Sequence, residues 1–167
     1  IMSYRGGARQ EADMYQNIKD IADMINENQD WTFRFQGSRF KHIEERTGKN
    51  HEYTNPTTLM QFYKEYHELN ANIAFFPLLT NVFNVGKSNI SLLESTYSGS
   101  AFFGCKGLHE FNYDFVVDIS SGVKESFESY KNELDSLETM NNEAWQWILE
   151  NRLLSEVNKL RIERILA

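Results

Sequence analysis

Basic and aromatic side chains alternate in one short window of the sequence, between Trp31 and His51. The window holds five basic and two acidic residues, a net charge of +3, within a chain whose net charge is −7. Positive groups for phosphates beside rings that stack on bases are the combination with which proteins bind single-stranded nucleic acids. The residues of this predicted nucleic-acid- or phosphate-binding site are Arg34, Arg39, Lys41, Arg46, Lys49, Phe35 and Phe40.

The same window permits two other interpretations. Alternation along residues 31–36 would place Phe33 and Phe35 on one face of a strand and Arg34 and Gln36 on the other. The rings would then face the core, and the basic side chains would form a solvated edge or contact an acidic protein partner.

The cysteine and the histidines form no recognisable catalytic or metal-binding set. His42, His51, His67 and His109 include no closely spaced ligand pair, and Cys105 is the only cysteine, so we predict no metal site and no cofactor. Cys105 and His109 could pair as nucleophile and base, although a lone cysteine in an apolar run is more typical of a core. An enzyme whose site combines scattered residues stays a second alternative.

One short motif resembles the end of a phosphate-binding loop, Gly86-Lys87-Ser88. Such a loop needs a glycine five residues before Gly86, where this chain has Asn81. It also needs a helix after the motif, whereas the composition of Ile90–Leu93 is typical of a strand. We therefore interpret the motif as a turn.

Length and composition predict one globular domain over residues 1–167, with 41% hydrophobic and 25% charged residues. The single cysteine excludes an internal disulfide, and no secretory segment opens the sequence, which favours an intracellular setting, cytoplasmic or host cytoplasmic. The longest apolar run, Ile73–Leu79, is too short to span a membrane.

Sixteen asparagines against eight alanines are typical of AT-rich genes, as in viruses and mobile elements. Ile1 before Met2, and a helical pattern that continues to the end, indicate a piece of a longer chain.

The clearest strand pattern runs from Phe111 to Ile119, where apolar and polar residues alternate, and we predict that it forms the centre of a sheet. Shorter strands are predicted at 31–36, 82–85, 90–93 and 101–105. Pro77 makes Ile73–Leu79 an edge strand or an irregular segment. Residues 3–9 are predicted to be a loose arm and residues 49–54 a loop.

Apolar stripes predict helices over residues 9–28, around residues 40–48 and from Asn55-Pro56 onward. Two further stripes, from Val123 and from Trp145, predict a C-terminal helical pair, either a hairpin or one helix bent at Asn141-Asn142. The predicted fold class is therefore α+β, with an antiparallel or mixed sheet of about four to six strands, an N-terminal helix, a middle helix and the C-terminal pair. Strands and helices do not alternate regularly in this assignment, which argues against a doubly wound sheet.

These features together predict a non-catalytic binding or interaction domain that acts through protein–protein contacts. Residues 107–150 hold ten acidic and two basic residues, a net charge of −8. We expect a protein partner or self-association rather than a membrane. Binding of nucleic acid or nucleotides through residues 31–51 is the main alternative.

Overall fold

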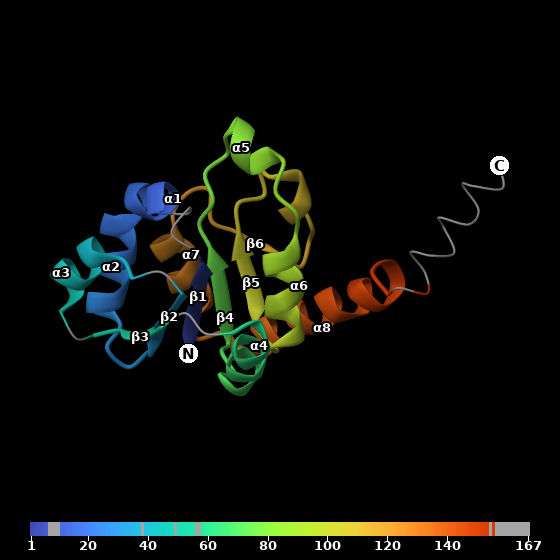
Figure 1. The fold of residues 1–167 in the computed structure, drawn as a ribbon, viewed down its shortest axis with the longest axis horizontal. Coiled ribbons are helices and arrows are strands. Elements are labelled where there is room, and N and C mark those ends of the chain that lie inside the picture. Colours follow the sequence, from blue (N-terminus) through green and yellow to red (C-terminus); the bar gives the residue numbers. More distant parts are fainter. Residues whose placement is uncertain (7–10, 38, 49, 56–57, 154, 156–167) are drawn as a thin grey trace.

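The computed structural model describes residues 1–6, 11–37, 39–48, 50–55, 58–153 and 155. Within these residues six strands form one sheet in the order β3-β2-β1-β4-β5-β6, and every pair of neighbours is parallel (Figure 1). The strands are β1 (Met2–Gly6), β2 (Phe33–Gly37), β3 (Glu52–Thr54), β4 (Ile73–Phe76), β5 (Ala101–Gly104) and β6 (Val117–Asp118).

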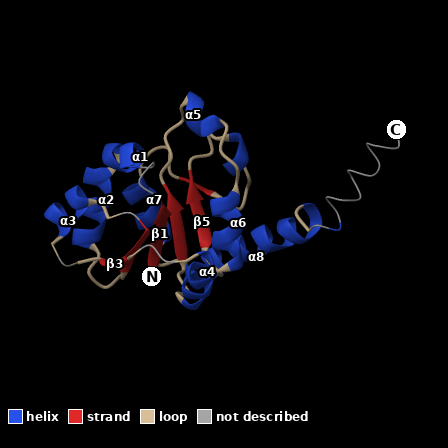
Figure 2. Ribbon diagram, viewed as in Figure 1, coloured by secondary structure: helices blue, strands red, loops and turns tan. Residues whose placement is uncertain are grey.

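Helices connect most of the strands and surround the sheet (Figure 2). They are α1 (Glu11–Gln16), α2 (Ile18–Glu27), α3 (Lys41–Thr47), α4 (Leu59–Glu68), α5 (Val82–Val85), α6 (Ile90–Tyr97), α7 (Val123–Tyr130) and α8 (Leu134–Asn151), with a short 3₁₀ helix, η2, at His109–Phe111. None of the helices in the described part of the chain is long and apolar enough to cross a membrane.

The predicted combination of helices with one sheet is confirmed, but the prediction of an antiparallel or mixed sheet is wrong, because all the pairings are parallel. Parallel neighbours need crossover connections, which helices provide here. Strands and helices alternate from β1 to β5. The argument against a doubly wound sheet was therefore also wrong, because β1 and β3 had been assigned to an arm and a loop, and α5 and α6 to strands.

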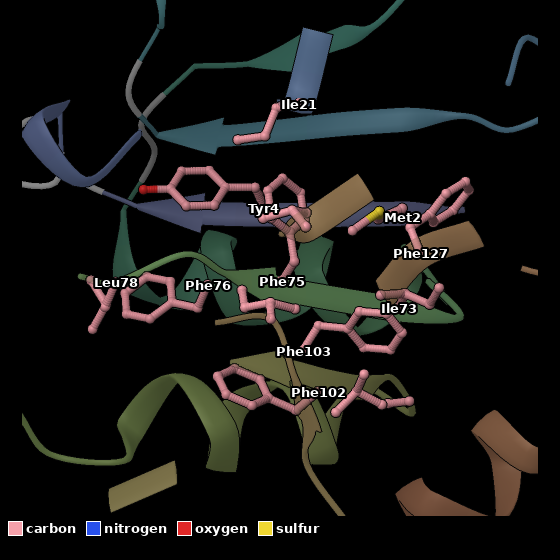
Figure 3. Close-up of a cluster of buried hydrophobic side chains, with 14 of the residues drawn as sticks. Met2, Tyr4, Ile21, Ile73, Phe75, Phe76, Leu78, Phe102, Phe103 and Phe127 are labelled. Carbon is pink, nitrogen blue, oxygen red and sulfur yellow. The ribbon is translucent and has the colours of Figure 1, made fainter. Parts of the chain in front are cut away.

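Most of the apolar core lies on one face of the sheet, although Phe102 of β5 alternates with Phe103 and packs on the other face, with its ring centroid 5.0 Å from that of Phe111 (Figure 3). The strand register places Tyr4, Phe35 and Phe75 side by side on this first face. Helices α2 and α7 cover it, and the ring of Phe127 on α7 lies 5.6 Å from that of Phe33 on β2. The apolar stripe of the helix predicted over residues 9–28 is buried at Met14, Ile21 and Ile25, but the chain forms two helices there, α1 and α2, separated at Asn17, and residues 9 and 10 lie outside the described part.

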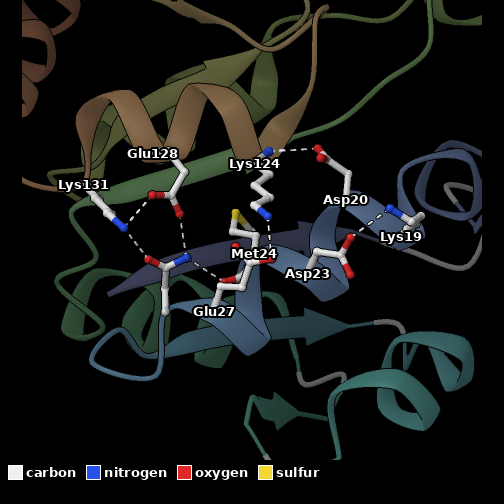
Figure 4. Close-up of polar contacts among 9 residues, drawn as sticks. Lys19, Asp20, Asp23, Met24, Glu27, Lys124, Glu128 and Lys131 are labelled. Carbon is white, nitrogen blue, oxygen red and sulfur yellow. Dashed lines mark hydrogen bonds and ion pairs between the residues drawn. The ribbon is translucent and has the colours of Figure 1, made fainter.

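Polar contacts join α2 to α7 above this core (Figure 4). The backbone N–H of Lys124 donates to Asp20 Oδ2 at 2.8 Å, and its Nζ donates to Glu27 Oε1 at 2.6 Å. At the other end, Asn28 Nδ2 donates to Glu128 Oε1 at 2.7 Å. Because Asp20 lies 104 positions from Lys124, these contacts fix two helices against each other that are far apart in the sequence.

The opposite, second face is covered by α4 and α6 and is more polar. Arg5 of β1 forms an ion pair with Glu94 of α6, and its guanidinium lies 4.4 Å from the centre of the Phe62 ring on α4. The hydroxyls of Tyr66 and Ser95 lie 3.1 Å apart and join the two helices. Burial raises the pKa of Tyr66 and lowers the pKa of Arg5.

The segment predicted to be the central strand, residues 111–119, is instead at the edge of the sheet. Only Val117 and Asp118 pair as a strand, and Phe111 belongs to η2. Burial nevertheless alternates over most of the segment, because Phe111 and Phe115 are buried while Asn112 and Asp114 are exposed, and only the buried Val116 breaks the pattern. Turns therefore bury the alternate side chains without forming the strand.

The C-terminal helical pair is present, but its break lies elsewhere than predicted. The chain leaves the helix at Lys131–Glu133, between α7 and α8, whereas Asn141 and Asn142 lie inside α8. Asn141 Nδ2 donates to the carbonyls of Thr96 and Ser100, at 3.1 and 3.0 Å. This asparagine thus connects α8 to the start of β5 rather than interrupting the helix.

Candidate functional site

The strand order reverses between β1 and β4, which lie side by side in the middle of the sheet. From β1 the chain continues to β2 on one side, and from β4 it continues to β5 on the other. In open parallel sheets, ligand sites usually lie beyond the carboxyl ends of the strands at such a point. Two helices flank this position here, α1 after β1 and α5 after β4.

A buried carboxylate on α1 holds the chain that follows β4. Asp13 Oδ1 accepts the backbone N–H of Leu79 at 3.1 Å and Asn84 Nδ2 at 2.8 Å. The ammonium of Lys87 lies 3.9 Å from the other oxygen, Oδ2. Asp13 is 6% exposed, so these contacts fix α5 to α1 with little competition from water.

Helix α5 has its polar side chain inside and its apolar side chains outside. Asn81 caps the helix by accepting the backbone N–H of Asn84 at 2.8 Å. Asn84 is 2% exposed, whereas Val82, Phe83 and Val85 are 95%, 68% and 55% exposed. We call these three exposed residues the α5 tip, which stands at the top of the molecule in Figure 1.

The α5 tip carries no reactive group of its own. Lys87 Nζ lies 5.2 Å from the centre of the Phe83 ring, close enough for a cation–π contact. Burial lowers the pKa of Lys87, and the charge of Asp13 partly opposes this shift. Apolar side chains beside a balanced pair of charges are suited to contact with another apolar surface.

A small pocket of about 180 Å³ lies at the same edge, beyond β4, β5 and β6. Ser120 Oγ donates to Asp118 Oδ1 at 2.6 Å, so it accepts the thiol proton of Cys105, whose Sγ lies 3.1 Å away. The hydroxyl of Thr80, 3.3 Å from Sγ, can then donate to the sulfur. These hydrogen bonds pair the buried Cys105 with two hydroxyls, and not with His109 as the sequence had allowed.

Asp118 arranges the two loops at this pocket. Its Oδ1 also accepts the backbone N–H groups of Lys106 and Ser120, at 3.0 and 3.1 Å. Desolvation raises the pKa of Asp118, but these hydrogen bonds outweigh it and hold the pKa below its usual value. The carboxylate thus has a structural role, and no base lies in contact with the thiol of Cys105 among these residues.

The basic residues of the window 31–51 that the structure describes do not all belong to one element, and three of the four are paired with acidic side chains. Arg34 lies on β2 and forms an ion pair with Glu52 on β3. Arg39 precedes α3 and pairs with Glu44, and Lys41 lies 3.7 Å from Glu45. Arg46 is exposed on α3, and Lys49 lies outside the described residues.

The two rings of the predicted site, Phe35 and Phe40, are buried in the core, 3% and 8% exposed. Both rings pack against Tyr4, and their centroids lie 5.9 Å (Phe35) and 5.4 Å (Phe40) from the centroid of the Tyr4 ring. Stacking on a base needs an open ring face. Nucleic-acid binding through this window stays a prediction, but Phe35 and Phe40 are not available to stack on bases.

The histidines are scattered. His51 is half-buried beside Thr47, His42 is near Glu45, and His67 and His109 are exposed. Within the part of the chain that the structure describes, no three His, Cys, Asp or Glu side chains are placed to hold a metal ion.

Sequence reasoning missed the α5 tip, because valines and a phenylalanine in a short run are typical of a strand. The usable signal was Asn81, three residues before Asn84, since an asparagine in that position can cap a helical turn. The contact with Asp13, 71 positions from Asn84, has no sequence signal.

The sequence matches no protein-family model, and no curated protein matches it significantly.

Proposed function

We propose that this protein is a non-catalytic interaction domain that self-associates through the α5 tip. The observation that supports this proposal is the reversed burial of α5, with Asn84 inside and Val82, Phe83 and Val85 outside. Folding alone gains nothing from exposing three apolar side chains on a helix whose polar residue is buried. A contact surface explains the arrangement, because association would remove them from water.

A second copy of the chain is the partner that we propose. Two tips that meet about a twofold axis are self-complementary, as such an interface requires. Lys87, whose ammonium contacts the Phe83 ring, is paired with the carboxylate of Asp13, so these two charges balance each other. We place this activity inside the cell, where a single unpaired cysteine is stable.

The expected association is weak. Burial of a Val or Phe side chain contributes about 1.5–3 kcal/mol, so six side chains supply roughly 10 kcal/mol. Association itself costs at least about 4 kcal/mol. The remainder, about 6 kcal/mol, corresponds to a dissociation constant on the order of tens of micromolar.

Sedimentation equilibrium between about 5 and 300 µM tests the proposal. The wild type should shift from monomer to dimer, and the double variant Val82→Ser/Phe83→Ser should stay monomeric over that range. Met60→Ser is a matched control, because Met60 is 79% exposed on α4 and lies outside the tip. A wild-type chain that stays monomeric at 300 µM, or a control that dissociates as the double variant does, would contradict the proposal.

A further inference from the structure

A second surface lies on the second face of the sheet, over β2 and β3. An open groove of about 650 Å³ runs between these strands and α4. The polar side chains that line this groove and enter the argument below are Arg34, Gln36, Glu52, Thr54, Glu65 and Glu68.

Gln36 has a buried acceptor that the described part of the chain leaves unpaired. Its Oε1 has no hydrogen-bond partner there, although the residue is only 5% exposed and lines the groove. The strand register places Gln36 between Arg5 and Thr54. Arg5 is directed to Glu94 instead, and so does not supply the missing donor. A buried amide oxygen without a donor is unfavourable, which points to a donor from a bound molecule.

The groove around this acceptor is acidic. Three carboxylates line it, those of Glu52, Glu65 and Glu68, against the guanidinium of Arg34, and the ammonium of Lys64 lies 3.9 Å from Glu68 Oε1. Arg34 Nε donates to Glu52 Oε2 at 2.7 Å, and Gln61 Nε2 donates to Glu65 Oε1 at 2.7 Å. A carboxylate has about four acceptor positions, so each retains capacity for another donor. The groove therefore favours a positively charged donor and disfavours a phosphate.

We propose that this groove binds a primary alkylammonium group, which donates to Gln36 Oε1 and to the carboxylates of Glu65 or Glu68. An ammonium is compact, carries three donors and stands on a flexible alkyl chain, so it can reach a single buried acceptor. A guanidinium presents a planar fork that suits paired acceptors instead. Both a free polyamine and a lysine side chain of another protein carry this chemistry.

Isothermal titration calorimetry at pH 7 and 150 mM NaCl, with two probes, tests the proposal and distinguishes the sources. The probes are spermidine and a trilysine peptide blocked at both ends. At least one should bind to the wild type, and the tighter of the two identifies the source. Gln36→Met should weaken binding about tenfold and Glu68→Gln about threefold. The control Glu143→Gln, an exposed carboxylate on α8, should change binding less than twofold.

A thermal melt of Gln36→Met serves as a control, because it shows whether a loss of binding is caused by unfolding. Methionine has a similar volume and removes the unpaired oxygen, so we expect the melting temperature to stay equal or to rise. The proposal is overturned if neither probe binds at 10 mM. It is also overturned if Gln36→Met binds as tightly as the wild type, or if Glu143→Gln weakens binding as much as Glu68→Gln does, because attraction would then come from net charge alone.

Discussion

The carboxylate of Asp13 provides a sharp test of how the α5 tip is held. Both of its closest hydrogen bonds use the same oxygen, Oδ1, which accepts the N–H of Leu79 and the amide of Asn84. An asparagine at position 13 retains one acceptor oxygen and loses the charge, whereas an alanine removes both. The two substitutions therefore separate the hydrogen bonds from the charge.

The expected magnitudes follow from these contacts. A hydrogen bond to a charged group contributes about 1.5–3 kcal/mol. Asp13→Ala removes two of them, but Leu79 is only half-buried and water can replace one, so we expect a loss of about 3 kcal/mol. Asp13→Asn keeps both hydrogen bonds as weaker, neutral ones and loses the contact of 3.9 Å with the partly exposed Lys87, so we expect a smaller loss of about 1–2 kcal/mol.

Urea denaturation at pH 7 measures both free energies of unfolding, and an unchanged m value ensures that they are comparable. Hydrogen exchange gives a local readout, because the backbone N–H of Val85 donates to the carbonyl of Asn81 at 3.0 Å within α5. Exchange at Val85 should accelerate in Asp13→Ala more than in Asp13→Asn. Equal losses in the two variants, or a loss below 1 kcal/mol in Asp13→Ala, would refute this reasoning.

Two further predictions concern stability. Phe127 is fully buried against Trp31 and Phe33, so Phe127→Ala should lower the free energy of unfolding by about 3–5 kcal/mol in urea, and a loss under 1 kcal/mol would contradict the packing. Burial lowers the pKa of His51 from its ordinary value of 6.5. The unfolded chain then binds more protons, so stability should fall as the pH drops through about 6.5 and level off below the folded pKa. His51→Gln should flatten this dependence in pH-dependent urea titrations, and an identical slope in the variant would contradict it.

The tautomer of His51 follows from its neighbours. Thr47 donates its hydroxyl to the carbonyl of Ile43 at 2.9 Å, so its oxygen accepts from His51 Nδ1–H at 2.8 Å. A second proton would go to Nε2 without breaking this bond. The pH dependence therefore comes from burial of the charge rather than from a lost hydrogen bond.

Sequence alone predicted the elements whose signals are local. The stripe of α2, the alternation of β2 and the apolar run of β5 correspond to structure. Each of these buries side chains in a period set by its own backbone. Gly48, at the end of the helix predicted around residues 40–48, follows α3 with φ +61°, a conformation that favours glycine.

Elements whose polar residues have distant partners were predicted wrongly. In β1, Met2 and Tyr4 alternate with Ser3 and Arg5, a pattern too polar and too short to indicate a central strand. Arg5 is accommodated there because Glu94, 89 positions away, pairs with it. The sequence contains no signal for that contact, and so the strand order, with both sites that depend on it, could not be predicted.

Pro77 misled the assignment of β4 for a different reason. A proline inside a strand excludes a central position, because it lacks the N–H that the neighbouring strand needs. The strand, however, ends at Phe76, so Pro77 lies just beyond the last paired residue. The predicted segment extended three residues too far, to Leu79, and the inclusion of Pro77 moved a central strand to the edge of the predicted sheet.

The Asp13→Ala variant also distinguishes association through a preformed surface from nonspecific hydrophobic association. Asp13→Ala leaves Val82, Phe83 and Val85 in the chain but frees α5 from α1. If association depends on a tip that is already ordered, the released helix must be ordered again on binding, and the dimer should weaken. If exposed apolar groups merely adhere, a loosened α5 exposes at least as much apolar surface, and association should stay equal or increase. Sedimentation of this one variant therefore tests whether the hydrogen bonds of Asp13 contribute to the function that we propose.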